Sequence, residues 1–443
     1  MNKVNTDGQA DAPGALLILL LVCLTNVISM FLRTCPAILA LDLQASFQTG
    51  PGVLALLSSA TLIGYGIMQL PSGLITDAFG GRKTLSAFLL LAALATAAFA
   101  LAPHLPLAVG ARLLTGLSVA MVPAGGAILA LYFSPARYPQ ALSLLMASSS
   151  LGSLMASEPL ARLSGALGWQ GAILLAGGIS ALLGLVIFKV IKEKKPAAGG
   201  PAGVQAGGPS PWRIMLRNAA TVMGSKAAWP LMLWSMLASA VYFSIITMWG
   251  GPYLILGCGF SQMEASRVLL FQGGLTFFSI PLVSSLTRFF QRRTIVIACT
   301  LCGLAALITM ALYVGRLPGW LLVPLFLTVS TSSTAGATCI FALFRDNFPV
   351  SLTGTGIGCG NMLWPISASA LNVLFGNILS WRLTAGFADA GAQNAAGPEA
   401  LERLVNVGAY GFTWWAYVGI WAGALVVAVF FIREKFEVRV PKI

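Results

Sequence analysis

The sequence predicts an all-α integral membrane protein with twelve transmembrane helices, and three features support this prediction. Of the 443 residues, 57% are hydrophobic and only 9% are charged, whereas soluble proteins carry about 25% charged residues. The chain contains long, continuous apolar stretches, and a helix needs about 20 such residues to cross the hydrocarbon layer. These stretches do not alternate polar with apolar residues, which argues against the strands of a membrane barrel.

The apolar stretches form two groups of six. The first six helices are expected at 15–41, 52–73, 84–102, 106–133, 138–160 and 169–191. The second six are expected at 228–256, 265–289, 294–315, 320–343, 352–379 and 411–432. The segment 192–227 between them is rich in Lys, Pro and Gly, which predicts a flexible linker. We therefore expect two six-helix bundles, 15–191 and 228–432, with tails at 1–14 and 433–443.

Basic residues in the short loops predict the orientation, because lysine and arginine collect on the cytoplasmic side of a membrane protein. One side of the chain has Arg82, Lys83, Arg137, Arg288, Arg292, Arg293, Arg345, the linker and the C-terminal basic residues. The opposite side has only Arg162, Arg316, Arg382 and Arg403. We expect both termini in the cytoplasm, a location in the cell (inner) membrane, and the longest outer loop at 380–410.

A short charged turn separates the second and third apolar stretches. Residues 73–83 read Gly-Leu-Ile-Thr-Asp-Ala-Phe-Gly-Gly-Arg-Lys. This turn resembles the loop between helices 2 and 3 of the major facilitator superfamily, written G-x-L-x-D-R-x-G-R-R/K, with Ala78 and Gly81 in place of two arginines. The resemblance implies a secondary transporter of two six-helix repeats, with its substrate site near the midplane between them.

The resemblance also implies a gate on the cytoplasmic side. Its candidate residues are Gly73, Asp77, Gly80, Arg82 and Lys83. The carboxylate of Asp77 is expected to face the N-terminus of the helix at 352–379, whose free N–H groups carry partial positive charge. An ordinary basic loop that fixes topology is the alternative.

Arg33 lies inside the first predicted helix, and ionisable side chains within membrane spans are usually functional. Asn26, Ser29 and Arg33 share one helix face by their spacing. The segment resembles helix 1 of anion-transporting branches of the superfamily, and a guanidinium suits bidentate binding of a carboxylate or phosphate. The alternatives are that Arg33 extends to the membrane surface or pairs with Asp42.

Arg112 and Glu158 are two further charges placed inside predicted spans. Arg112–Ser118 resembles the helix 4 pattern R-x-x-x-G-x-G of the family, which implies a cavity-lining or proton-relay arginine. Glu158 is the candidate proton-coupling residue, since burial and nearby arginines shift the pKa of a carboxyl in opposite directions. The alternative for both is a structural ion pair between them.

Polar and aromatic residues at helical spacing complete the candidate substrate site, although helix packing and interface anchoring explain such residues equally well. The candidates are Tyr65, Gln69, Tyr242, Trp249, Gln272 and Asn361, besides Asn26, Arg33 and Arg112.

These features favour a proton-coupled importer of a small organic anion that works by alternating access. Anion exchange or uniport, drug or metabolite export, and a non-transporting membrane sensor are the alternatives. The sequence predicts no enzyme, cofactor or metal site, because His104 is the single histidine and none of the seven cysteines sits at zinc-site spacing with it. No nucleic-acid partner is expected either, since the net charge of +13 resides in topology-setting loops. The expected partners are the anion, protons and the lipid bilayer, and the expected state is a monomer.

Overall fold

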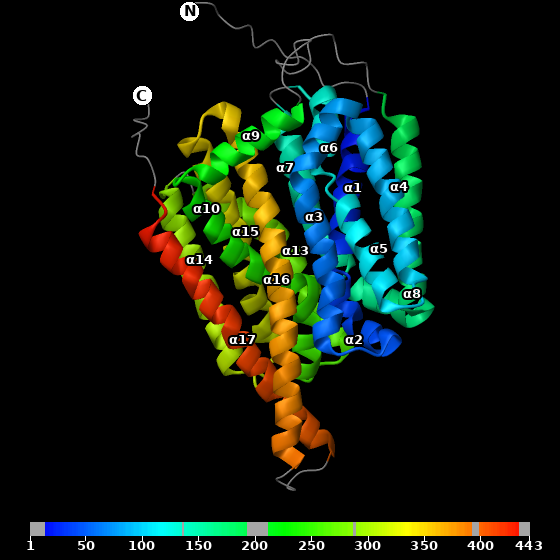
Figure 1. The fold of residues 1–443 in the computed structure, drawn as a ribbon, viewed down its shortest axis with the longest axis vertical. Coiled ribbons are helices and arrows are strands. Elements are labelled where there is room, and N and C mark those ends of the chain that lie inside the picture. The colour runs from blue at the N-terminus through cyan, green and yellow to red at the C-terminus, as the bar shows by residue number, and fades with distance from the viewer. Residues whose placement is uncertain (1–13, 135–136, 193–210, 287–288, 392–397, 434–443) are drawn as a thin grey trace, which may run out of the picture.

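The computed structural model describes residues 14–134, 137–192, 211–286, 289–391 and 398–433. These residues form a bundle of long helices in which α1 begins and α17 ends at the same end (Figure 1). We call this end the terminal face and the opposite end, where α2 lies, the far face. The predicted tails, apart from Gly14 and Arg433, and residues 193–210 of the predicted linker lie outside the described residues.

The first half contains eight helical segments. They are α1 (Ala15–Thr34), α2 (Pro36–Phe47), α3 (Pro51–Phe79), α4 (Gly81–Ala100), α5 (Leu105–Ser118), α6 (Val122–Tyr132), α7 (Tyr138–Met155) and α8 (Glu158–Val190). In the second half, α9 (Pro211–Gly224) is followed by one span made of α10 (Ala228–Trp234), α11 (Ala240–Ser244), α12 (Gly250–Pro252) and three π-helical stretches, 235–239, 245–249 and 253–257. The remaining helices are α13 (Gln262–Leu286), α14 (Arg292–Leu312), α15 (Gly319–Asn347), α16 (Val350–Gly391) and α17 (Pro398–Phe430).

The predicted fold class of twelve transmembrane helices in two bundles is confirmed. Among the described residues, ten spans are long and apolar enough to cross a membrane. The other two of the twelve spans are formed by α7 and α13. Both of these helices line the cavity described below.

The two halves repeat the same contact at the terminal face. Arg82, at the start of α4, donates a hydrogen bond of 3.3 Å from Nη1 to the backbone carbonyl of Ile191, just after α8. Arg293, at the start of α14, donates one of 2.6 Å from Nη2 to the carbonyl of Val429 near the end of α17. In both halves a basic residue that opens the third span therefore caps carbonyls at the end of the sixth, where such orphan acceptors occur.

Several predicted helices are interrupted, and proline explains each break, because its ring removes an N–H donor and clashes with the preceding turn. The predicted helix 15–41 is divided at Cys35 before Pro36, and 106–133 is divided between Ser118 and Val122, before Pro123. Ser29 donates a 2.7 Å hydrogen bond to the carbonyl of Val119 in the second gap. The predicted helix 138–160 ends at Met155, and Pro159 lies in the first turn of the next helix.

Hydrogen bonds and close backbone contacts join the halves at the middle and far levels. Ser59 and Ser369 each donate to the other's carbonyl, at 3.0 and 3.2 Å, where α3 crosses α16. The backbone N–H of Gly52 donates to Ser380 Oγ at 3.2 Å at the far end of the same pair. On the other side of the bundle α2 meets α12, where a Cβ at Gly251 would overlap a backbone carbonyl oxygen of α2. The far ends of the two halves are therefore packed together.

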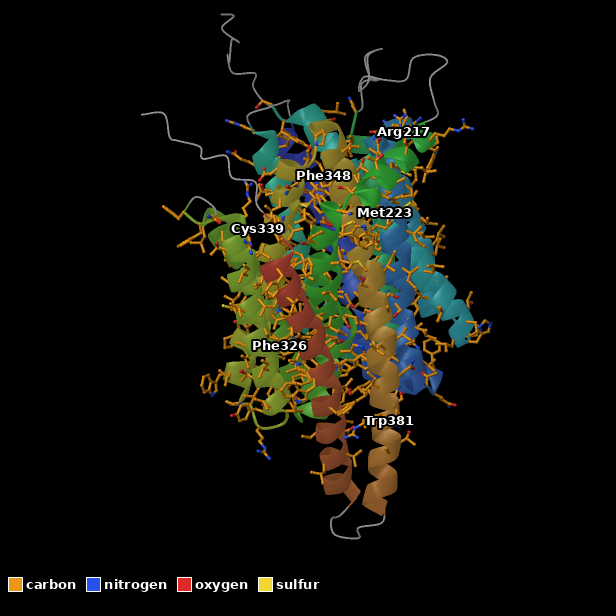
Figure 2. All side chains as sticks on the ribbon, turned by 60° about the vertical axis from the view of Figure 1, so that its left-hand side comes forward. Arg217, Met223, Phe326, Cys339, Phe348 and Trp381 are labelled. Atoms are coloured by element: carbon orange, nitrogen blue, oxygen red, sulfur yellow. The ribbon has the colours of Figure 1, made fainter. Side chains whose placement is uncertain are left out.

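The structure corrects the character of the segment 380–410, which was predicted as an outer loop: most of it is helical, and its side of the membrane stays a prediction. Helix α16 continues to Gly391 and α17 already begins at Pro398, so that the two extend beyond the bundle at the far face (Figure 1). Trp381 lies near the level where α16 leaves the bundle (Figure 2). Arg382 bridges the two helices by placing its guanidinium 4.4 Å from the ring centroid of Phe412.

Part of the predicted linker is also helical. Helix α9 occupies residues 211–224 and packs against α16 at the terminal face. Its Ala219 and Val222 are buried, while Trp212, Arg213 and Arg217 are exposed. Buried and exposed residues that alternate at helical spacing define an amphipathic helix. This half of the predicted flexible linker is therefore an ordered helix.

Helices α3 and α5 pack backbone to backbone through glycine. A Cβ at Gly116 would overlap the carbonyl oxygen of Thr61, whereas a Cβ at Gly110 on the same helix would meet nothing within 4 Å. We predict that Gly116→Ala destabilises the protein by about 1–3 kcal/mol through overpacking, while the control Gly110→Ala is neutral or slightly stabilising. Thermal unfolding midpoints in one detergent test this difference, and equal midpoints for the two variants would contradict the packing.

Candidate functional site

A cavity of about 170 Å³ lies between the two halves. The first half contributes Asn26, Met30, Arg33, Tyr65, Val122, Met146, Ser149, Ser150 and Ser153 to its lining. The second half contributes Tyr242, Phe243, Gln272, Gly273, Thr276, Thr334 and Trp364. The structure thus brings together five of the nine predicted substrate residues: Asn26, Arg33, Tyr65, Tyr242 and Gln272.

Arg33 is the only charged residue in the described lining of this cavity. It is 5% exposed, and its Nε donates a 3.2 Å hydrogen bond to the carbonyl of Ser29, one turn earlier in α1. Its guanidinium carbon lies 4.2 Å from the ring centroid of Tyr65 on α3. Within the described part of the chain its two Nη nitrogens donate no hydrogen bond and no carboxylate pairs with it, so that the expected alternative of a pair with Asp42 is wrong.

The backbone around Arg33 is held by polar contacts of α1 with its neighbours. Asn26 Nδ2 donates 2.6 Å to the carbonyl of Leu145 on α7 and reaches Ser148 Oγ at 3.4 Å. Ser29 donates to Val119 in the gap between α5 and α6. These buried bonds fix the rotation of α1 and therefore the direction in which Arg33 points, so that Asn26 acts on the cavity largely by positioning.

Aromatic side chains form one wall of the cavity, which we call the aromatic wall: Tyr65, Tyr242, Phe243 and Trp364. The rings of Phe243 and Trp364 are stacked with their centroids 3.8 Å apart. Tyr65 lies 5.9 Å from Trp364, and Tyr242 meets Phe243 edge to face at 4.9 Å. Three different helices, α3, α11 and α16, contribute these rings, which makes the wall part of the interface between the halves.

Hydroxyl and amide groups of α7 and α13 form a second wall, which we call the polar wall: Ser149, Ser150, Ser153, Gln272 and Thr276. Gln272 Nε2 donates 3.1 Å to Thr276 Oγ1, and Thr276 shares a 2.9 Å hydrogen bond with Ser330 on α15. Tyr242 lies near both Gln272 and Arg33. Gln272 and Thr276 are therefore fixed by a hydrogen-bonding network that links α13 to α15.

Four predicted substrate residues do not line this cavity, and Arg112 is the most informative of them. Arg112 is 1% exposed, with Nε 3.5 Å from the carbonyl of Leu57, Nη1 3.9 Å from Cys35 Sγ, and its guanidinium carbon 5.2 Å from the Phe99 ring centroid. Its Nη2 is buried without a partner in the described structure. Arg112 is thus enclosed in the first half at the kink between α1 and α2.

The other three residues lie elsewhere on their helices. Trp249 is buried against Phe375, with ring centroids 4.8 Å apart. Gln69 and Asn361 are partly buried on α3 and α16. Helical spacing placed these residues on the same face as cavity residues. It takes no account of the π-helical stretches of the seventh span or of the position of each residue along its helix.

Glu158 lies at the start of α8 near the far face, because the chain breaks after Met155. Its carboxylate accepts 2.6 Å from Arg162 Nη2 on the same helix and 3.4 Å from Arg267 Nε on α13 of the other half. The expected alternative of an ion pair between Glu158 and Arg112 is therefore wrong. Glu158 instead connects the two halves.

The predicted gating residues lie at the terminal face. Asp77 and Lys83 are exposed, and Asp77 has no hydrogen-bond or ion-pair partner in the described part of the chain, including the start of α16. Gly80 adopts φ +84° between α3 and α4, which is a conformation that favours glycine. A Cβ at Gly73 would meet nothing within 4 Å. The expected contact between Asp77 and α16 is not made in this conformation.

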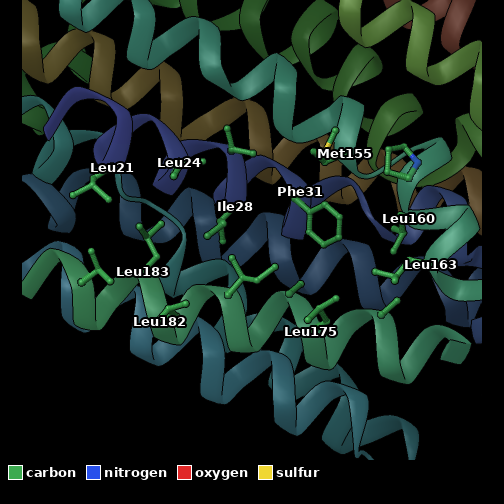
Figure 3. A pocket seen from close by; sticks show the side chains of 16 residues that line it. Leu21, Leu24, Ile28, Phe31, Met155, Leu160, Leu163, Leu175, Leu182 and Leu183 are labelled. Atoms are coloured by element: carbon green, nitrogen blue, oxygen red, sulfur yellow. The ribbon is translucent and has the colours of Figure 1, made fainter. Parts of the chain in front are cut away.

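A second hollow is a groove of about 450 Å³ between α1, α7 and α8 (Figure 3). Its lining consists of apolar residues such as Leu24, Ile28, Phe31 and Met155. Leu24, Leu175, Ile179 and Leu182 are also exposed on the outside of the bundle. A groove without hydrogen-bonding groups on the side of a membrane protein suits lipid chains, so that the smaller polar cavity is the candidate site for a solute.

Sequence reasoning missed several lining residues. The serines of α7 and Thr276 and Thr334 are small polar residues, which occur in membrane helices mainly as packing contacts. Nothing else in their sequence pattern separates a lining role from a packing role. No group of three or more His, Cys, Asp or Glu side chains that could hold a metal occurs in the described residues.

The family model described as Major Facilitator Superfamily matches residues 22–371. The fold is similar to that of a bacterial homologue of the human lysosomal transporter Spinster in its inward-facing, unoccupied conformation, with TM-score 0.74, 14% identity, and coverage of 95% of this chain and 97% of that one. It is also similar to a D-xylose–proton symporter, with TM-score 0.71, 16% identity, and coverage of 94% and 98%. No curated protein sequence is a significant match. These identities support the shared fold alone, while the family match covers most of the chain: the protein belongs to the major facilitator superfamily.

Proposed function

We propose that this protein imports a small organic anion, with Arg33 as the group that binds it. The observation that supports this proposal is the placement of Arg33. It is a buried guanidinium in the cavity between the halves, and it has two unpaired Nη nitrogens and no carboxylate partner among the described residues.

A charge buried without a partner is costly, and an ion pair with good hydrogen bonds offsets that cost. Two Nη nitrogens present the fork geometry that suits both oxygens of a carboxylate. Entry of an anion would therefore be favoured by the cavity itself, while a cation would meet like charge. The volume of about 170 Å³ is below the roughly 300–1,000 Å³ typical of sites for drug-sized ligands, which disfavours the alternative of drug export.

Alternating access requires one side of the cavity to be closed while the other is open. The contacts of α2 with α12 and of Glu158 with Arg267 support closure at the far face. We propose that the terminal face is cytoplasmic, because exposed basic residues such as Lys83, Arg213 and Arg217 lie there. The structure would then be a state closed toward the outside of the cell membrane, and Asp77 would close the terminal side by meeting α16 in the opposite state.

Coupling to protons, which the sequence predicts, and anion exchange are the two candidates for the energy source. The described lining of the cavity contains no carboxylate that could carry a proton beside the substrate, which favours exchange. Uptake of labelled carboxylates into proteoliposomes separates the two. Accumulation driven by an inward proton gradient supports symport. Acceleration only by trapped internal anion supports exchange, and no flux under any condition would refute transport of these anions.

Replacement of Arg33 tests the binding role. We predict that Arg33→Ala weakens anion binding by about 2–5 kcal/mol, the cost of removing one partner of a buried charge pair. Arg33→Lys should bind with intermediate affinity, because it keeps the charge and loses the fork. Isothermal titration with the exposed Arg316→Ala as control measures this, and unchanged affinity in Arg33→Ala would assign Arg33 to structure.

Glu158 is proposed to hold the far side closed through Arg267. Glu158→Gln and Arg267→Gln should each speed hydrogen–deuterium exchange at the far ends of α2 and α13, and the double variant should add little, as expected for partners in one interaction. The proton-coupling role of Glu158 stays a prediction, and the same variants give a different result if that role is correct. Loss of proton-driven accumulation with unchanged exchange at the far ends would support coupling and contradict the closing role.

Asp77 is proposed to stabilise the state in which the terminal side is closed. Asp77→Asn removes the negative charge that would face the N-terminus of α16, so we predict slower transport and faster deuterium exchange at the terminal ends of α3 and α16. Ala78→Asn, at the neighbouring exposed position, is the matched control. Equal transport and exchange in both variants would remove Asp77 from the gate.

A further inference from the structure

Different sides of the cavity have different chemistry, and together they restrict the ligand to a narrower class than the charge of Arg33 does. It combines one guanidinium, the aromatic wall and the polar wall in about 170 Å³. Each of the three parts comes from different helices, and the three parts together form the interface between the halves. Each part restricts one property of the ligand.

The single cation restricts the charge. Arg33 is the one charged group in the described lining, and it can neutralise one carboxylate. A second carboxylate would enter a buried space without a positive partner, which is costly. The charge count therefore favours a monocarboxylate over a dicarboxylate.

The aromatic wall restricts the shape. Arg33 stacks over Tyr65 at 4.2 Å, and the indole of Trp364 lies between Tyr65 and the stacked ring of Phe243. A ligand whose carboxylate binds Arg33 therefore has its body beside these rings. Flat π-systems gain from offset or edge contacts with aromatic side chains beyond the burial of area, whereas a puckered ring of the same size gains only the burial.

The polar wall restricts the substituents. Gln272, Ser150 and Ser153 bring amide and hydroxyl groups to the cavity, and these groups would lose hydrogen-bond partners against a purely hydrocarbon edge, which is unfavourable for buried polar groups. A hydroxyl or amino group on the ligand would satisfy them. The volume of about 170 Å³ lies below the roughly 300–1,000 Å³ of sites for drug-sized ligands, which favours a ligand of about single-ring size.

We propose that the substrate is a flat monocarboxylate of single-ring size, of the hydroxy- or amino-substituted aromatic acid class. This inference rests on the proposed anion transport and specifies its substrate. Arg33 binds the carboxylate, Trp364 and its neighbours in the aromatic wall contact the ring, and the polar wall binds the substituent.

Binding of matched small acids to the purified full-length protein tests this proposal. The probes are 3-hydroxybenzoate, 4-aminobenzoate, benzoate, cyclohexanecarboxylate, the dicarboxylate isophthalate and the neutral benzyl alcohol. We expect the substituted acids to bind most tightly and benzoate to bind about fivefold tighter than cyclohexanecarboxylate. Isophthalate should bind more weakly than benzoate, and benzyl alcohol should not bind detectably.

Variants test the aromatic class of the ligand separately from anion binding. Trp364→Leu should bring the affinities of benzoate and cyclohexanecarboxylate within about twofold of each other, while Trp320→Leu, at an exposed position outside the cavity, should leave the preference intact. Equal affinity of the wild type for the flat and puckered acids, with both lost in Arg33→Ala, would overturn the aromatic class and leave anion binding in place. Preference that survives Trp364→Leu would also overturn it. Failure of all the acids to bind would contradict the proposed function itself.

Discussion

The guanidinium of Arg33 is buried between the two halves, and no carboxylate among the described residues neutralises it. Burial of an unpaired charge is unfavourable, and the structure lowers that cost through the Ser29 carbonyl and the face of Tyr65. The remaining donors point to the space that both halves share. Arg112 is the instructive contrast, since it is buried as deeply but enclosed by Cys35, Leu57 and Phe99 within one half. Of these two arginines, Arg33 alone combines burial with access to the cavity.

The surroundings of the cavity suit a site whose two sides must open in turn. Small residues and short hydrogen bonds join the halves, as in the Ser59–Ser369 pair and the contact at Gly251. Such contacts allow close approach and yet bury few side chains that would have to repack on separation. Glu158 adds an ion pair with Arg267 at the far face, and the walls of the cavity come from both halves. A ligand that contacts both walls would therefore be sensitive to their relative position.

Periodicity and composition predicted the fold class, the two bundles and five of the cavity residues. The length of an apolar stretch indicates a helix that spans the membrane, and helical spacing indicates which side chains share one face of that helix. Breaks before Pro36, Pro123 and Pro159 had a local signal that the apolar pattern outweighed. The helical extension of α16 and α17 had none, since residues 380–410 are too polar to predict a span. Arg112 and Trp249 were misplaced for different reasons. The face of a helix on which Arg112 lies does not determine its position along the helix axis. The π-helical stretches around Trp249 rotate the residues that follow them away from the expected face. Serines of α7 were missed because their packing and ligand-binding uses have the same sequence pattern.

A structure of the protein with a bound single-ring monocarboxylate, labelled with bromine so that its position is unambiguous, tests the central claim most directly. The account predicts the carboxylate within hydrogen-bonding distance of the Arg33 Nη nitrogens, in the cavity between the aromatic and polar walls. An anion bound elsewhere, with the Arg33 nitrogens facing only water or a protein carboxylate, would contradict it.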